Sequence, residues 1–254
     1  MTATVHHFTA ADGIDLAWHE LGPETGDSRP VVLLHGLFSD AFTNWLRYGH
    51  AAAIAARGFR VIMPDLRAHG QSGKPHDPAF YPPDILASDG LALITHLGLE
   101  DYDLGGYSLG ARTSVRMVVL GATPQKLIVG GMGLAGLHAT GRRSGHFKKI
   151  LTGLGTFERG SPEWLAEAFL KTTGGDPQAL LPLLDTFVDT PEAEIAKIAI
   201  PTLVLSGAED SDNGSPQALA QLLPNGHYVE VPGNHMSAVI KPDLGRAMAD
   251  FLAR

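Results

Sequence analysis

The pentapeptide Gly106-Tyr107-Ser108-Leu109-Gly110 lies between a predicted buried strand, 102–105, and a predicted helix, 109–120. A G-x-S-x-G sequence in this setting is typical of a nucleophile elbow, a sharp turn that lifts a serine hydroxyl above the edge of a sheet. Glycines are needed at both ends, because a side chain there would collide with a neighbouring strand or helix. An ordinary glycine-rich turn is the alternative, since the pattern also occurs by chance. The flanking strand and helix favour the elbow.

Outside the elbow, short apolar runs alternate with segments of helical periodicity. Val31–Leu34, between Pro30 and His35-Gly36, is typical of a strand buried on both faces. Runs 4–9 and 14–20 flank a turn at Asp12–Gly13 and predict a hairpin. The repeated units predict an α/β fold, with a mostly parallel central sheet flanked by helices. The other expected strands are 60–63, 126–129, 202–205 and 227–231, and the other expected helices are 41–57, 84–97, 216–223 and 243–252.

Residues 134–199 interrupt this alternation. They contain no convincing strand, and their short amphipathic pieces at 146–154, 162–171, 177–187 and 191–198 predict helices. We therefore expect a helical insertion between two core strands. The predicted organisation is a core of residues 1–133 and 200–254 with a helical unit of residues 134–199.

A serine nucleophile needs a base that a third group holds in place. The strand at 202–205 leads into Ser206-Gly207-Ala208-Glu209-Asp210, and the strand at 227–231 leads into Pro232-Gly233-Asn234-His235. Carboxyl ends of parallel strands meet at one sheet edge, so these acids and His235 are expected beside Ser108. The candidates follow one another in the chain order Ser, Asp, His. Asp212 and Glu209 are alternatives to Asp210 at this point.

Through these motifs the chain resembles α/β-hydrolases of the esterase, lipase and enol-lactonase type over nearly its whole length. The resemblance implies that Ser108 is the nucleophile, His235 the base and Asp210 the orienting acid, with Asp210 favoured over Asp212 by the spacing after Gly207. It also implies that the N–H groups of Leu37 and Leu109 form the oxyanion hole. The helical insertion corresponds to the family's cap. The motifs carrying the resemblance are 33–37, 64–72, 106–110, 200–210 and 232–235, in which Ala68 stands where many relatives have glycine.

For several other patterns we expect a structural role or a position on the solvated surface. His35, His69 and His227 are expected to be structural or solvated rather than catalytic. Gly131-Met132-Gly133-Leu134-Ala135-Gly136 matches a dinucleotide fingerprint, but residues 137–142 are poor helix starters, so we expect only a crossing from core to cap. The basic cluster Arg142, Arg143, Lys148 and Lys149 is expected on a solvated face of the cap, with a substrate-carboxylate anchor as the alternative.

Composition excludes several classes of function. The 254-residue chain has a net charge of −8 and shows no basic footprint for nucleic acid. It has no cysteine, which excludes disulfides, thiolate nucleophiles and cysteine-based metal sites. No His-Glu-x-x-His spacing occurs, so neither metal nor cofactor is expected. No signal peptide or membrane helix is predicted, and we expect a cytoplasmic monomer or homodimer.

The predicted function is that of a serine carboxylesterase acting on small-molecule esters of short to medium chain length through an acyl-enzyme. Three alternatives stay open at this point. The same triad could hydrolyse lactones or C–C bonds, it could be retained in a ligand receptor, or it could serve cofactor-free oxygenase or lyase chemistry.

Overall fold

The predicted, mostly parallel sheet forms the centre of the computed structural model, which describes residues 2–23 and 28–254. β1 (Thr4–Thr9) and β2 (Asp15–Leu21) form the predicted antiparallel hairpin, and β2 also pairs antiparallel with β4 (Arg60–Pro64). All remaining pairs are parallel. The strands are β1 (Thr4–Thr9), β2 (Asp15–Leu21), β3 (Pro30–Leu34), β4 (Arg60–Pro64), β5 (Asp103–Tyr107), β6 (Leu127–Gly130), β7 (Thr202–Gly207) and β8 (Gly226–Val231), in the spatial order β1-β2-β4-β3-β5-β6-β7-β8.

The parallel register brings the ends of the central strands to one edge. Leu34 pairs with Gly106, and Tyr107 pairs with Gly130. Between β7 and β8, Gly207 is in register with Val231. The segments that follow β3, β5, β7 and β8 therefore leave the sheet at the same edge, which is where the crevice of a parallel sheet forms.

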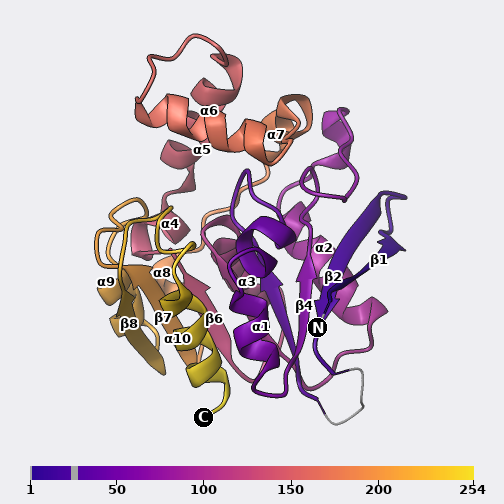
Figure 1. Cartoon of the computed structure of the whole chain (residues 1–254), viewed down its shortest axis with the longest axis vertical. Coiled ribbons are helices and arrows are strands. Elements are labelled where there is room, and N and C mark those ends of the chain that lie inside the picture. The colour runs from indigo at the N-terminus through magenta and orange to yellow at the C-terminus, as the bar shows by residue number, and fades with distance from the viewer. Residues whose placement is uncertain (1, 24–27) are drawn as a thin grey trace.

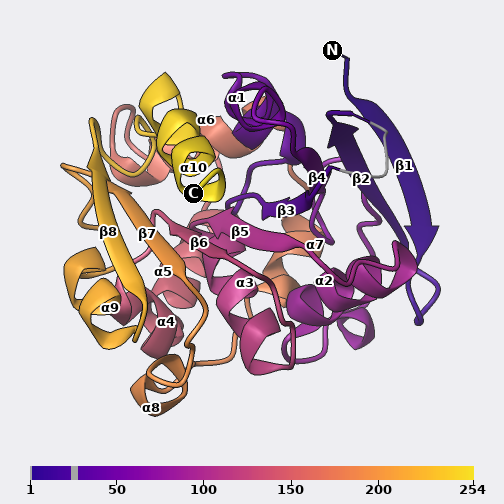
Figure 2. The same cartoon turned by 90° about the horizontal axis from the view of Figure 1, so that it is seen from below.

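Helices cover both faces of the sheet (Figure 2). α1 (His50–Ala55) and α10 (Pro242–Leu252) lie on one face, and α2 (Ile85–His96), α3 (Leu109–Val119) and α9 (Pro216–Leu222) lie on the other. Successive residues of β3 alternate between the two cores: Val31 and Leu33 belong to the α1 and α10 side, whereas Val32 and Leu34 belong to the opposite side. This two-sided burial explains why the central strands read as continuous apolar runs.

The single helix predicted over 41–57 is wrong. The segment instead contains a short π-helix, Phe42–Leu46, followed by α1. Gly49 separates them with a φ of 79°, a left-handed conformation that ends a helix. Asn44 in the π-helix is tied to the neighbouring loop, because its Oδ1 accepts a hydrogen bond from the N–H of Gly36 at 3.0 Å. Tertiary contacts thus override the helix propensity of the alanine-rich sequence.

Residues 134–199 contain α4 (Leu134–His138), α5 (Thr140–Thr152), α6 (Pro162–Thr172), α7 (Pro177–Leu183) and α8 (Glu192–Ile195), and no strand within this fully described stretch. α5, α6 and α7 stand away from the sheet (Figure 1). α4 instead contacts α9, and α8 contacts α3. The boundaries of the predicted cap therefore stay a proposal, with α5 to α7 as its outer part.

No helix in the described part of the chain has the length and apolarity to cross a membrane.

Candidate active site

The serine elbow has the strained geometry that the pentapeptide predicts. Ser108 joins β5 to α3 with φ 55° and ψ −113°, in a region that only glycine enters readily. A Cβ at Gly106 would lie 2.3 Å from the carbonyl carbon of Gly110, and a Cβ at Gly110 would lie 2.0 Å from the carbonyl oxygen of Leu34. Both glycines are therefore required by the close approach of α3 to the sheet.

Ser108, His235 and Asp210 meet at the carboxyl edge. His235 Nε2 lies 3.0 Å from Ser108 Oγ, and its Nδ1 lies 2.9 Å from Asp210 Oδ2. The three side chains come from the loops that follow β5, β8 and β7. The side chains of His235 and Asp210 are 11% and 4% exposed, so bulk water has little access to the hydrogen bond that joins them. The hydroxyl of Tyr107 donates to the backbone carbonyl of His235 at 2.7 Å and holds that loop in place.

Asp210, rather than the alternatives Asp212 and Glu209, contacts the histidine. No hydrogen bond joins Asp212 to His235: the Oδ2 of Asp212 pairs with Arg143 at 3.4 Å, and its N–H donates to Asp210 Oδ1 at 3.1 Å. Glu209 is exposed. Burial would raise the pKa of Asp210, but the hydrogen bond and charge of His235 outweigh it, so the pKa is lowered and the carboxylate stays ionised.

Two backbone N–H groups beside Ser108 are free to donate. Within residues 2–23 and 28–254, the amides of Leu37 and Leu109 have no hydrogen-bond acceptor. Leu109 begins α3, where the first N–H groups have no partner within the helix. Leu37 follows Gly36, whose Cβ position lies 3.6 Å from the Cβ of Ser108. The loop carrying Leu37 is held by Asn44, and the side chains of Leu37 and Ser108 line the same cleft.

The histidines expected to be structural at 35 and 69 are buried within the loops behind the site. The N–H of Leu66 donates to His35 Nε2 at 2.9 Å, and the N–H of Phe38 donates to His69 Nε2 at 3.3 Å. Burial, with a further contribution from the charge of His35, lowers the pKa of His69 to about 3, so that this ring is neutral. Ala68 in the same loop has a φ of 70°, a conformation that the glycine of many relatives would adopt with less strain.

Two clefts open onto Ser108 and His235. The larger has a volume of about 420 Å³ and lies under the helical insertion, between Phe38 and the α5–α6 residues Phe147, Leu165 and Phe169. The smaller, about 80 Å³, is lined by Asn44, Tyr48 and the segment after His235. Both are largely apolar, and both are lined by Ser108 and His235.

The glycines at 131–136 serve close packing. A Cβ at Gly133 would lie 2.2 Å from the carbonyl oxygen of Gly214, and one at Gly136 would strike the side chain of Met132. The space that a pyrophosphate would need is thus filled by the chain itself. The expectation that residues 137–142 start no helix is wrong, because α4 follows Gly133 directly and α5 begins at Thr140. Burial of Leu137 and packing on α9 stabilise α4 despite its sequence.

In the described ranges, one group of three side chains could hold a metal ion: ligand atoms of Asp210, Asp212 and His235 lie within 4.8 Å of one another. Both ring nitrogens of His235 are already engaged, one by Asp210 and the other by Ser108. A metal ion would have to break one of these hydrogen bonds. The geometry therefore suits proton transfer at Ser108 better than metal binding.

Two residues that line the site, Asn44 and Arg112, were not predicted from the sequence. Asn44 lies within a stretch that looks like plain helix, and no local signal shows that it reaches Gly36. Arg112 lies one helical turn after Ser108, on a helix whose neighbouring residues are all buried. A basic residue among small and apolar positions is a signal that could have identified it.

Comparison with known proteins supports the architecture. The profile described as "Alpha/beta hydrolase family" matches residues 31–244. The chain belongs to the alpha/beta hydrolase family. This hydrolase is 31% identical to the AB hydrolase superfamily protein YisY of Bacillus subtilis over 217 residues, 74% of this chain and 76% of that protein.

A shorter match relates this hydrolase to an epoxide hydrolase of Caballeronia sordidicola, with 35% identity over 88 residues, 35% of this chain and 26% of that protein. Among solved structures, the enol-lactonase of Burkholderia xenovorans superposes with a TM-score of 0.75. It covers 98% of this chain and 100% of its own at 22% identity, which establishes a shared fold.

Proposed function

We propose that this hydrolase is a serine carboxylesterase that cleaves small-molecule carboxylic esters through an acyl-enzyme. The observation that carries the proposal is the position of His235, which lies within hydrogen-bond distance of both Ser108 Oγ and Asp210 Oδ2. In this proposal Ser108 is the nucleophile, His235 the general base and Asp210 the group that orients the imidazole. The free N–H groups of Leu37 and Leu109 are the proposed oxyanion donors.

Each step uses groups of the chain and water. Ser108 Oγ attacks the acyl carbon while its proton passes to His235 Nε2, and the carbonyl oxygen becomes an oxyanion facing the two N–H donors. The C–O bond to the alcohol then breaks, and His235 returns the proton to the leaving oxygen. Water attacks the acyl-serine in the same way, releasing the carboxylic acid and restoring the hydroxyl. The buried carboxylate of Asp210 stabilises the imidazolium in both halves of the cycle.

The chemistry of serine favours acyl substrates over the epoxide suggested by one partial relative. Attack on an ester or a lactone gives an acyl-serine, which water can cleave at its carbonyl carbon. Attack on an epoxide would give an alkyl ether of Ser108, which has no carbonyl for water to attack. A lactone is a cyclic ester and passes through the same steps, so lactone hydrolysis is the nearest alternative activity.

Cleft size supports a preference for short to medium acyl chains. The volume of about 420 Å³ lies in the lower part of the range of roughly 300–1,000 Å³ for small-molecule sites, and that of about 80 Å³ lies below it. We propose that residues 134–199 act as the cap of this cleft, because side chains of α5 and α6 form its outer wall. Hydrolysis of p-nitrophenyl esters should therefore fall steeply for long acyl chains.

The test combines labelling and turnover of Ser108→Ala. A fluorophosphonate should label Ser108 alone in the wild-type protein, as read by peptide mass spectrometry. The alanine variant should lose about five or more decades in kcat on p-nitrophenyl butyrate while keeping its fold by circular dichroism. Retained activity in Ser108→Ala would remove the nucleophile assignment. Labelling without turnover of any ester or lactone would favour a receptor that retains the triad.

A further inference from the structure

A buried arginine beside Ser108 has no acidic partner. Arg112 is 5% exposed and lies on α3, one turn after the nucleophile elbow. Its Nε donates to the carbonyl of Gly136 at 3.2 Å, and its guanidinium lies 4.7 Å from the ring centre of Phe187. Its Nη1 is buried without any hydrogen-bond acceptor among the described residues. A buried guanidinium without a carboxylate is costly, so buried charges are ordinarily paired.

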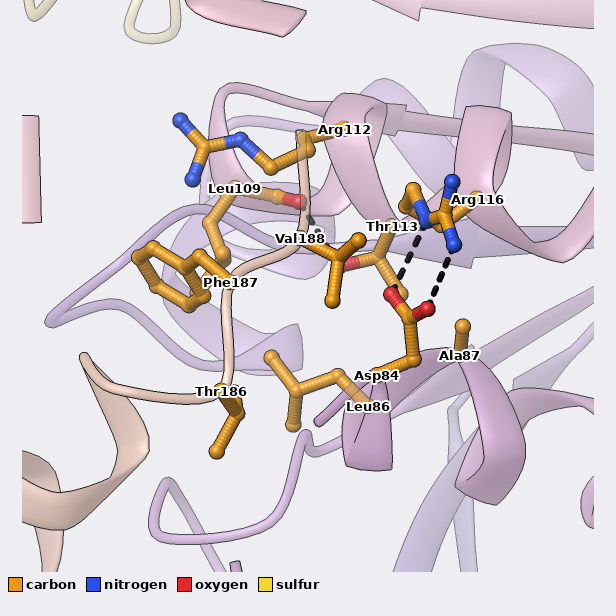
Figure 3. A pocket seen from close by; sticks show the side chains of 10 residues that line it. All are labelled: Asp84, Leu86, Ala87, Leu109, Arg112, Thr113, Arg116, Thr186, Phe187 and Val188. Atoms are coloured by element: carbon orange, nitrogen blue, oxygen red, sulfur yellow. Dashed lines mark hydrogen bonds and ion pairs between the residues drawn. The ribbon is translucent and has the colours of Figure 1, made fainter. Parts of the chain in front are cut away.

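The neighbouring arginine on the same helix shows the usual arrangement. Arg116 donates through Nε and Nη2 to the two carboxylate oxygens of Asp84, at 2.9 and 2.5 Å (Figure 3). In the same view the guanidinium of Arg112 points away from that pair, toward Phe187. The one carboxylate that acts on the pKa of Arg112, that of Asp189, accepts a hydrogen bond from the N–H of Thr140 instead. Of these two arginines on α3, Arg116 is therefore neutralised by a carboxylate and Arg112 is not.

Arg112 lines a small recess that reaches Ser108. This recess, about 20 Å³, is bounded by Ser108, Leu109, Arg112, Arg143, Phe187 and Asn213. A volume of this size holds about one water molecule, so one carboxylate oxygen enters it while the rest of the group stays in the adjoining larger cleft. Burial and the nearby charge of Arg143 lower the pKa of Arg112 to about 10, which leaves it protonated at neutral pH. Two guanidinium groups therefore border one recess, and the partner of Arg143, Asp212, is itself 44% exposed at its side chain.

The recess lies on the acyl side of the reaction. His235 must return a proton to the leaving alcohol, so the alcohol has to sit in a space that His235 lines. Both larger clefts include His235, whereas the recess at Arg112 does not. The recess instead includes Leu109, whose N–H is a proposed oxyanion donor. The acyl group, which remains on Ser108 with its carbonyl oxygen at Leu109, therefore lies next to Arg112, where the recess adjoins the larger cleft at Leu37, Ser108 and Phe147.

Building on the proposed esterase function, we propose that the substrate is a half-ester of a short dicarboxylic acid, whose free carboxylate binds Arg112 in this recess. The carboxylate supplies the acceptor that Nη1 lacks, and Arg143 contributes a second positive charge at the rim. Hydrolysis would convert the half-ester and water into the dicarboxylic acid and the alcohol. The narrow recess limits the carboxylate to a short spacer.

Matched substrates test the proposal in the wild-type protein. Monomethyl succinate, glutarate and adipate are compared with neutral isosteres in which an isopropyl group replaces the carboxylate, for example methyl 5-methylhexanoate for the glutarate ester. We expect at least one half-ester to exceed its isostere about tenfold or more in kcat/KM, the gain that one hydrogen bond to a charged group supplies. Ratios at or below one for all three lengths, with the neutral esters hydrolysed, would overturn the carboxylate site and leave the esterase intact.

Substitutions at Arg112 test whether this residue causes the preference for the half-ester. Arg112→Met should bring the ratio close to one, and Arg112→Lys should retain part of it. Arg142→Gln removes the same charge from an exposed position on α5 and is the matched control, for which the ratio should not change. A ratio that survives in Arg112→Met would assign the preference to another group.

Binding separates the anion site from turnover. In a Ser108→Ala background, monomethyl glutarate should bind at least about tenfold more tightly than methyl 5-methylhexanoate by calorimetry, and Arg112→Met should remove the difference. This result would stand even if no ester were hydrolysed, in which case the esterase proposal alone would fail. Equal binding of the two esters would overturn the carboxylate site.

Discussion

The two buried arginines Arg67, in the scaffold, and Arg112, in the candidate active site, differ in whether carboxylates neutralise their charge. Arg67 is 1% exposed and pairs with two carboxylates: Nε and Nη2 bind Asp89 at 2.9 and 2.8 Å, and Nη1 binds Asp12 at 2.5 Å. Arg112, which is also buried at 5% exposed, donates one hydrogen bond to a backbone carbonyl. The scaffold neutralises its buried charge, whereas the site beside Ser108 leaves one available. The difference indicates that a ligand completes the second environment.

The polar groups in the loops near the two arginines differ in the same way: those near Arg67 are paired, and two of those near Arg112 are not. Behind the site, the carboxylate of Asp65 accepts hydrogen bonds from the N–H groups of Ala41 and Gln71, both at 2.8 Å, and from His19 at 3.2 Å. At the site, the N–H groups of Leu37 and Leu109 have no acceptor in the described part of the chain. Changes in the first region should therefore cost stability, and changes in the second should cost activity.

The largest effect after loss of Ser108 itself is expected at Asp210. Asp210→Asn should lower kcat by about four decades, about 5.4 kcal/mol of barrier, because the amide no longer stabilises the imidazolium and favours the wrong tautomer. Thermal unfolding should change little. Asp212→Asn is the matched control two residues away and should retain activity within about tenfold. If Asp212→Asn proved the more damaging change, the acid role would pass to Asp212.

In the scaffold, Arg67→Met should lower the free energy of unfolding by about 3–5 kcal/mol, because it leaves the buried carboxylate of Asp89 without its partner. Urea denaturation measures this difference directly. Arg57→Met breaks an ion pair whose two side chains are 49% and 53% exposed, and should cost less than about 1 kcal/mol. Similar losses in the two variants would contradict the assigned role of Arg67.

Acid should weaken the scaffold through Asp65. Burial would raise the pKa of this carboxyl, but its hydrogen bonds and the nearby histidines lower it from 3.8 to about 2. Because the folded value lies below the unfolded one, the contribution is present above about pH 4 and is lost as the pH falls toward 2. The free energy of unfolding should drop by about 2 kcal/mol across that window. Asp65→Asn should lack this drop, whereas the exposed Asp101→Asn should retain it; parallel curves for all three proteins would contradict the assignment.

The smallest effect is expected from Arg112→Met in the absence of ligand. The change removes a buried charge together with one hydrogen bond, so the two contributions oppose each other and stability should shift by less than about 1 kcal/mol. Urea denaturation beside Arg67→Met gives the comparison. A loss as large as that of Arg67→Met would show that Arg112 holds the scaffold and is not reserved for a ligand.

Much of the architecture follows from local patterns. The apolar runs predicted the strands of the sheet, because a strand buried on both faces needs apolar side chains at every position. The pentapeptide predicted the strained turn at Ser108, because two flanking glycines are needed where α3 approaches the sheet. The ends of β7 and β8 predicted that Asp210 and His235 would lie near Ser108, since carboxyl ends of parallel strands share an edge.

Other features depended on contacts between distant parts of the chain. The helix predicted over 41–57 is broken because Asn44 binds the loop at Gly36, and α4 forms because Leu137 is buried against the core. Arg67 and Arg112 are the same residue type in similarly buried positions, yet carboxylates from distant segments reach only the first. By itself, then, the sequence determined the order of the strands and the positions of Ser108, Asp210 and His235 after β5, β7 and β8. Only the tertiary structure decided which buried charges are paired, because the partner of a side chain is set by folding and not by its neighbours in sequence.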